Sequence, residues 1–281
     1  MKLMLANVAI AEKDDDFAVN CLGKIWKRNF ELVKDKDTEI ISKFCNWGIA
    51  GMEGFCYPAI DMLNAQAVLQ ACVQGEKEDY DGILITCFGD PMLDQIRSLV
   101  DIPVMSIGES AMRIASVMAK KFGLVTISEA NIYETWHRVD QLGLSDYCAG
   151  IVATKEPQEK QPGGIIHAED TIRYFTEAAE KLIALGAEIL IPCCGLMSPS
   201  LRLAPGCEEE YPDGVIAIDG VPVMDVMSVA VQMLEGAVKL KKAGSPWIGR
   251  SGIYRMPTKT ALESGRMVLQ DDRQQFWDLK L

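Results

Sequence analysis

The chain has 281 residues, of which 49% are apolar and 24% charged, and its formal net charge is −12. This is the composition of a globular protein and excludes a disordered or fibrous chain. The negative charge repels nucleic-acid backbones and no basic stripe offsets it, while no apolar run reaches the ~20 residues of a membrane helix. We therefore expect neither nucleic acid nor a membrane as a partner.

Short apolar runs alternate with amphipathic stretches along the chain. Predicted strands cover residues 3–9, 83–87, 102–107, 122–127, 189–193 and 221–224, and predicted helices cover residues 15–32, 91–99, 110–120, 130–142, 170–185 and 226–241. This alternation favours parallel sheets covered by helices on both faces. The tail, residues 244–281, is expected to pack across a lobe or a subunit interface, with a short helix over 260–268.

A weak internal repeat divides the chain. Residues 81–87 share their pattern with 187–194, residues 102–106 with 221–225, and the opening strand with 122–128. We predict an α/β fold of two pseudo-symmetric lobes, each a parallel sheet flanked by helices, with the active site in the cleft between them. Residues 1–109 and 222–281 are predicted to form lobe 1, and residues 110–221 lobe 2.

The nine cysteines indicate the compartment. Their number is odd and their spacing irregular, so we expect free thiols in a reducing environment, the cytoplasm by default. The apolar N-terminus runs at once into an acidic cluster, which favours a buried strand over a signal peptide. With two histidines and no Cys-x-x-Cys pair, no metal site is predicted.

Two cysteines occupy equivalent positions in the repeat. Cys87 and Cys194 each end a predicted strand, and Asp90-Pro91 or Ser198-Pro199 follows as a predicted N-cap of the next helix. A thiol beside free backbone N–H groups and a helix N-terminus is expected to have its pKa lowered from ~8.5 toward neutrality. A core role is common for a single cysteine, but the symmetric pair favours function. Cys193 points away from Cys194 along the strand, so only one of them faces the cleft.

Further candidate substrate-binding residues flank these positions. Gly89 and Gly195 allow a substrate to approach the backbone closely. Asn7 and Thr126 end equivalent strands, where they either bind substrate or cap a turn. Phe88 either supplies an apolar wall or belongs to the core.

Two thiols facing each other across a cleft suit proton transfer at a carbon next to a carbonyl. One thiolate removes the proton and the other thiol protonates the opposite face, while the backbone N–H groups of the two turns stabilise the enolate. Two negative charges at close range are unfavourable, so one proton is shared by the pair. This chemistry requires no cofactor.

The sequence motifs around Cys87 resemble those of a known protein family. Residues 85–91, which end in Cys-Phe-Gly-Asp-Pro, residues 101–104 and residues 108–111 closely resemble the first-cysteine region of hydantoin racemases, a branch of the Asp/Glu/hydantoin racemase superfamily. Residues 51–54 and 194–197 are similar to that branch's Ser-Ile-Glu-Gly and Cys-Ala-Gly-Met strings. The resemblance spans most of residues 1–240.

The resemblance implies two pseudo-symmetric lobes, Cys87 and Cys194 as the two acid/base groups, a small-molecule substrate, no cofactor and frequent homo-oligomers. The family's opening Asn-Pro-Asn-Thr/Ser is here Asn7-Val8-Ala9-Ile10, and the loop after Cys194 is longer, so the sequence leaves the substrate open among hydantoins, amino acids and related small acids. A decarboxylase, a cis-trans isomerase and a non-catalytic ligand-binding protein on the same scaffold remain as alternatives.

Overall fold

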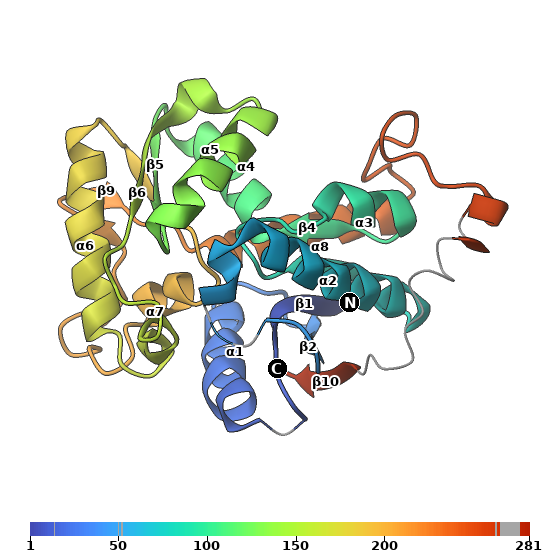
Figure 1. The fold of residues 1–281 in the computed structure, drawn as a ribbon, viewed down its shortest axis with the longest axis horizontal. Coiled ribbons are helices and arrows are strands. Elements are labelled where there is room, and N and C mark those ends of the chain that lie inside the picture. The colour runs from blue at the N-terminus through green and yellow to red at the C-terminus, as the bar shows by residue number, and fades with distance from the viewer. Residues whose placement is uncertain (14, 50, 52, 262, 265–275) are drawn as a thin grey trace.

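The structure, a computed structural model, describes residues 1–13, 15–49, 51, 53–261, 263–264 and 276–281. Its centre is formed by two sheets, each flanked by helices (Figure 1). In the order of their hydrogen bonding, the larger sheet consists of β10 (Phe276–Lys280), β2 (Glu39–Cys45), β1 (Lys2–Ile10), β3 (Gly82–Ile85) and β4 (Val104–Ser106). The smaller sheet consists of β6 (Cys148–Ala153), β5 (Phe122–Thr126) and β7 (Ile189–Pro192).

Helices and short turns connect these strands. The α-helices are α1 (Gly23–Glu31), α2 (Pro58–Lys77), α3 (Leu93–Leu99), α4 (Ile107–Met118), α5 (Ile132–Gln141), α6 (Glu169–Ala184), α7 (Met197–Leu203) and α8 (Val226–Lys242). A π-helical segment, η1 (Phe17–Leu22), precedes α1, and the 3-10 turns are η2 (Glu53–Cys56), η3 (Glu129–Asn131), η4 (Ser145–Tyr147) and η5 (Gln161–Ile165). A small hairpin pairs β8 (Ala217–Ile218) with β9 (Val221–Pro222). None of the described helices is long and apolar enough to span a membrane.

The larger sheet is buried on both faces. Met4 and Ala6 pack on the side of α2 and α3, while Leu3 and Leu5, which alternate with them, pack on the side of α1 and α8. Because successive side chains of a strand point to opposite faces, residues 3–6 of β1 must all be apolar, and the buried Asn7 that follows them is a polar exception. The short apolar run near the start of the sequence has this origin.

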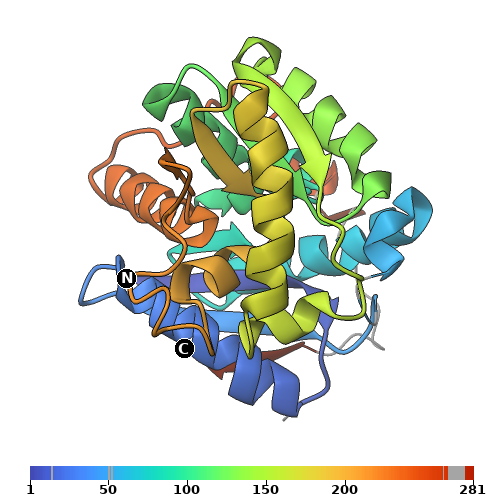
Figure 2. The same ribbon diagram turned by 90° about the vertical axis from the view of Figure 1, so that its left-hand side faces the viewer.

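The smaller sheet repeats this arrangement. Helix α6 covers one face of this sheet (Figure 2), and α4 and α5 lie on the other. Phe175 of α6 packs beside Val125 and Leu190. Leu3 of β1 pairs with Gly82 of β3, and Phe122 of β5 pairs with Ile189 of β7, both in parallel. The two pseudo-symmetric lobes predicted from the repeat are therefore confirmed.

Helices α4 and α8 join the two lobes. Helix α4 follows the larger sheet yet lies against β5 and β7, whereas α8 follows β9 and lies against β3 and β4. The two helices also pack against each other, through a shared apolar cluster that contains Ala111, Met227 and Ala230. The lobe boundaries predicted above remain predictions, but the two sheets are held together by this crossed pair of helices.

Several elements were not predicted. Strand β2 carries buried Ser42 and Lys43, which interrupt its apolar pattern, and α2 buries Asn64 and Gln70 among its apolar residues. The predicted strand over 221–224 is only the short β9, extended by a single parallel bridge between Leu190 and Val223. The tail contributes β10, which pairs antiparallel with β2. The predicted helix over 260–268 falls largely outside the described residues.

The two predicted helix caps were wrong in the same way. Helix α3 begins only at Leu93, and the Asp90 carboxylate accepts a hydrogen bond from the Gly108 N–H of α4, at 3.0 Å. Ser198 lies inside α7, and its Oγ accepts from the Val226 N–H at the start of α8, at 3.1 Å. Because neighbouring parallel strands end at the same edge, each side chain caps the helix that follows the adjacent strand.

A substitution at Gly108 tests the tight contact between the start of α4 and the turn that follows β3. A Cβ atom there would lie 2.1 Å from the Phe88 carbonyl oxygen, so Gly108→Ala must displace backbone and is expected to lower the free energy of unfolding by about 1–3 kcal/mol. Gly236→Ala is the matched control, since a Cβ on this helical glycine meets no atom within 4 Å and should stabilise α8 by about 0.5–1 kcal/mol. Urea unfolding measures both. Equal stability of the two variants would contradict the junction described here.

Candidate active site

Cys87 and Cys194 each follow the carboxyl end of a strand, β3 in the larger sheet and β7 in the smaller one. Cys87 follows β3 within a turn closed by the Asp90 N–H on the Cys87 carbonyl, at 3.3 Å, and Cys194 follows β7 just before α7. Both thiols are half-buried and free. The structure thus places both cysteines in strand-to-helix turns, as the repeat predicted.

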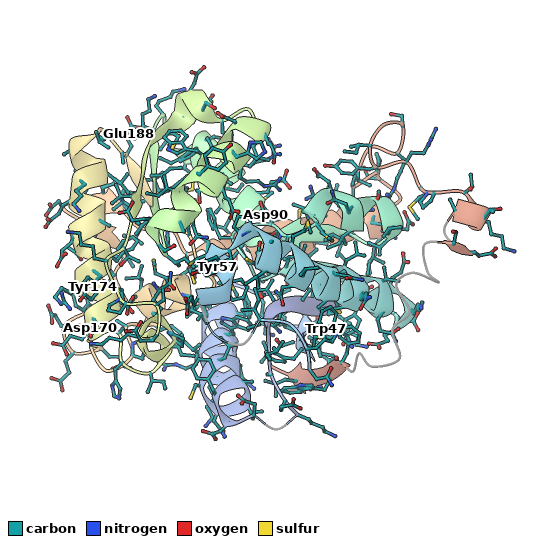
Figure 3. The ribbon with its side chains drawn as sticks, viewed as in Figure 1. Trp47, Tyr57, Asp90, Asp170, Tyr174 and Glu188 are labelled. Carbon is teal, nitrogen blue, oxygen red and sulfur yellow. The ribbon has the colours of Figure 1, made fainter. Side chains whose placement is uncertain are left out.

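The two turns approach each other directly. A Cβ atom on Gly195 would lie 2.5 Å from the Thr86 carbonyl oxygen, so the backbone beside Cys194 touches the backbone beside Cys87. Trp26 of α1 fixes the second turn by donating its Nε1–H to the Gly195 carbonyl at 3.1 Å. Figure 3 shows Asp90, at the end of the first turn, in the middle of the molecule between the two sheets.

Burial, rather than the helix ends, dominates the thiol acidities. Desolvation raises the pKa of Cys87, the charge of Asp61 raises it further, and a backbone hydrogen bond from Gly89 only partly opposes them. Desolvation also raises the pKa of Cys194, against the N–H groups of Met197 and Leu196. The expected shift of both pKa values toward neutrality was therefore wrong, because the cost of burying a thiolate outweighs the backbone N–H groups at both turns.

The two thiols are nonetheless different and coupled. Cys194 receives hydrogen bonds from two backbone N–H groups, that of Leu196 lying 3.4 Å from Sγ, whereas Cys87 receives one. A charge on Cys194 raises the pKa of Cys87, so the two sulfur atoms interact electrostatically. An ionised Cys194 therefore favours a protonated Cys87.

Of the adjacent pair, Cys194 faces the open side. Cys193 is buried in the central core, its N–H bonded to the Val125 carbonyl at 2.8 Å and its thiol 3.5 Å from the Ile191 carbonyl. Cys194 instead lines a narrow pocket that is partly open to solvent. The other residues that line this pocket are Ile127, Glu156, Gln161, Thr171, Leu196 and Met197.

The other predicted substrate-binding residues lie close by, but most are internal. Asn7 is buried, and it donates to Ser42 and to the Lys43 carbonyl at 2.6 and 3.0 Å and accepts from Thr86, which ties β1 to its two neighbours. Thr126 is buried at the end of β5, and Phe88 belongs to the core. Gly89 is exposed at the turn.

Two acidic groups that the sequence did not single out act on the cysteines. Asp61, in the first turn of α2, is half-buried, and burial together with the charge of Glu134 raises its pKa to about 6. Glu156 lies in the loop after β6, and its charge raises the pKa of Cys194. Neither acid belongs to a recognisable sequence motif, and each lies near a thiol only because of the tertiary structure.

Polar contacts between the lobes surround the two turns. Arg138 of α5 pairs with the fully buried Asp90 carboxylate at 2.9 Å. The loop with η2, which includes the predicted family loop 51–54, meets the other lobe where Ser128 Oγ lies 3.3 Å from Cys56 Sγ and Asn131 donates to the Phe55 carbonyl at 3.0 Å. Met52 of that loop lies outside the described residues. No cluster of three metal-ligating side chains occurs in the described parts of the chain.

Comparisons with known proteins agree with this architecture. The chain is 28% identical over 229 residues to a hydantoin racemase of Pseudomonas sp. strain NS671, covering 79% of this chain and 82% of the relative. Its fold is similar to that of an allantoin racemase from Klebsiella pneumoniae, with a TM-score of 0.70 and 23% identity, covering 92% and 94% of the two chains.

A more distant structure has the same fold. It is a maleate cis-trans isomerase variant from Nocardia farcinica with a covalently bound succinylcysteine intermediate, and it matches with a TM-score of 0.54 and 16% identity, over 92% of this chain and 99% of that one.

The family itself is settled by a match over most of the chain. The family model described as Asp/Glu/Hydantoin racemase matches residues 53–234, a stretch that includes both strand-end cysteines and the pocket beside Cys194. The chain therefore belongs to the Asp/Glu/hydantoin racemase family and is an enzyme of the isomerase class.

Proposed function

We propose that the protein racemises or epimerises a small carbonyl compound, with Cys87 and Cys194 as the two acid/base groups and without a cofactor. The observation that carries this proposal is the approach of the two turns, with Gly195 against the Thr86 carbonyl and the two thiols electrostatically coupled. A substrate carbon held between the two sulfur atoms has one thiol on each face. This is the arrangement that inversion by proton transfer requires.

The difference between the thiols assigns their roles in one direction of the reaction. Cys194, with two backbone N–H groups on its sulfur, is the thiol that ionises first, and its thiolate removes the proton from the carbon next to the carbonyl. Cys87, beside Asp61, is the thiol and protonates the opposite face, after which the charge resides on Cys87. The reverse reaction begins from that second state. Backbone N–H groups of the turns stabilise the enolate that forms in between.

A 5-substituted hydantoin or a related cyclic ureide is the proposed substrate class. The similarity to a protein named as a hydantoin racemase supports it, and so does the fold shared with an allantoin racemase. The hydrogen removed is then the one on C5, next to the C4 carbonyl. We further expect a homo-oligomer in the cytoplasm, with residues 1–109 and 222–281 forming one lobe and residues 110–221 the other.

The alternatives within this fold differ in what they require of the cysteines. A decarboxylase needs one cysteine to protonate an enolate, and a cis-trans isomerase needs one to add to a double bond. The succinylcysteine intermediate of the maleate isomerase relative is such an adduct in that protein. Full activity of Cys87→Ser would favour the cis-trans isomerase over the racemase.

Solvent exchange tests the proposed reaction. A single enantiomer of 5-benzylhydantoin incubated in D₂O should lose optical activity and gain deuterium at C5, because the proton delivered comes from a thiol that exchanges with solvent. Cys87→Ala and Cys194→Ala should each reduce racemisation by at least about 1000-fold, since an acid/base group contributes that order of rate. Cys193→Ala is the matched control and should retain turnover. Racemisation without deuterium uptake would refute the mechanism.

The acidity of Cys87 provides an independent test. Asp61, whose pKa is about 6, is ionised at pH 8 and opposes a thiolate at Cys87, so Asp61→Asn should lower the pKa of Cys87. Iodoacetamide alkylation of Cys87 at pH 8, followed by peptide mass spectrometry, should then be about three- to tenfold faster than in the wild type. The ratio of the alkylation rate in Asp61→Asn to that in the wild type should fall toward one below pH 6, where Asp61 is protonated. Asp146→Asn is an exposed control and should leave the alkylation rate of Cys87 unchanged at both pH values. An unchanged alkylation rate in Asp61→Asn would show that Asp61 does not act on Cys87.

A further inference from the structure

The pocket beside Cys194 contains a buried acceptor without a partner. Gln161 lines this pocket and is only 6% exposed, yet its Oε1 receives no hydrogen bond from the described residues. A buried carbonyl oxygen left without a hydrogen bond destabilises the folded protein. A ligand that brings a donor to this oxygen recovers that energy.

The orientation of the Gln161 amide is fixed by its other end. Nε2 donates to the Ile127 carbonyl at 2.9 Å and to the Glu156 carbonyl at 3.2 Å, which uses both of its hydrogens. Turning the amide over would place its oxygen against two carbonyl oxygens, so the acceptor assignment follows from the chemistry of the partners. The unpaired atom is therefore an acceptor, and it requires a donor.

A second acceptor lies in the same pocket. Glu156 is 5% exposed, and its Oε1 accepts from Thr171 at 2.9 Å. None of the seven described residues that line the pocket is basic. A carboxylate or phosphate in this pocket would thus meet a carboxyl group and an amide oxygen, and the cations whose charges reach Glu156, Lys160 and Arg173, do not line the pocket, whereas an N–H group would meet two acceptors.

We propose that Gln161, assisted by Glu156, is a specificity-determining residue that accepts a hydrogen bond from an N–H group of the substrate beside Cys194. This inference rests on the proposed function, because it places the ureide edge of the substrate in this pocket. It selects a neutral ring that has N–H groups next to its carbonyls, and it disfavours a free amino acid whose carboxylate would occupy the same position.

The experiment removes the donor from the ligand and the acceptor from the protein. Racemic 5-methylhydantoin and its N1-methyl and N3-methyl derivatives are titrated calorimetrically into the wild type and Gln161→Leu; a racemic ligand gives no net turnover. In the wild type, one of the two N-methyl compounds should bind at least about tenfold more weakly than the parent compound. In Gln161→Leu this difference should fall to about twofold or less, because the acceptor is gone.

Gln70→Leu is the matched control. Gln70 is also a buried glutamine with an unpaired amide, but it lies in α2, away from the pocket, so this variant should keep the wild-type discrimination. Discrimination that persists in Gln161→Leu, or its absence in the wild type, would overturn the inference. Should Gln161→Leu fail to fold, Glu156→Gln decides: it should improve the binding of hydantoin-5-acetate relative to 5-ethylhydantoin about threefold or more. An unchanged ratio would overturn the inference.

The binding experiment and the deuterium experiment can fail separately. Hydantoins that bind with Gln161-dependent discrimination but gain no deuterium would refute the proposed reaction and leave the pocket assignment intact. Deuterium uptake at C5 with discrimination that does not depend on Gln161 would refute the pocket assignment alone. Hydantoins that do not bind at all would overturn both.

Discussion

The site depends on one close approach of backbone to backbone. Gly195 lies so near the Thr86 carbonyl that any side chain there would collide with it, and this contact brings the ends of β3 and β7 together. Helices α4 and α8 hold the contact in place, because α4 follows β4 of the larger sheet and packs against β5 and β7 of the smaller one, while α8 follows β9 and packs against β3 and β4. Hence the distance between the two cysteines is set by the central packing of the molecule, with no long flexible loop between them.

Burial and hydrogen bonding act in opposite directions on the two thiols. Backbone N–H groups at the turns favour the thiolates, but desolvation is the larger effect and raises both pKa values. The nearby acids Asp61 and Glu156 add to it, one beside each cysteine. Both thiols are thus held mainly protonated in the free protein, and the asymmetry of their N–H donors decides which one ionises first.

Much of the fold was predictable because burial on two faces leaves a simple signature. The apolar runs marked β1, β3, β5 and β7, and their repeat marked Cys87 and Cys194. Buried polar side chains hid the rest: Ser42 and Lys43 interrupt β2, and the small residues of β6 gave no clear pattern. Glu156 and Gln161 come from an irregular loop that only tertiary structure brings to Cys194. The helix caps predicted at Asp90 and Ser198 were wrong for a related reason. Each side chain accepts its hydrogen bond from the first turn of a later helix, α4 or α8, and not from the helix that follows it directly.

The two sheets differ in how the chain assembles them. All strands of the smaller sheet come from one continuous stretch, residues 122–192, whereas the larger sheet takes its first strand from the N-terminus, its cover α8 from residues 226–242 and its edge strand β10 from residues 276–280. During synthesis, the continuous sheet can form while the ribosome is still extending the chain. The larger sheet keeps an uncovered apolar face until α8 has been made and an unpaired β2 edge until β10 has been made, so its aggregation-prone surfaces are covered later than those of the smaller sheet.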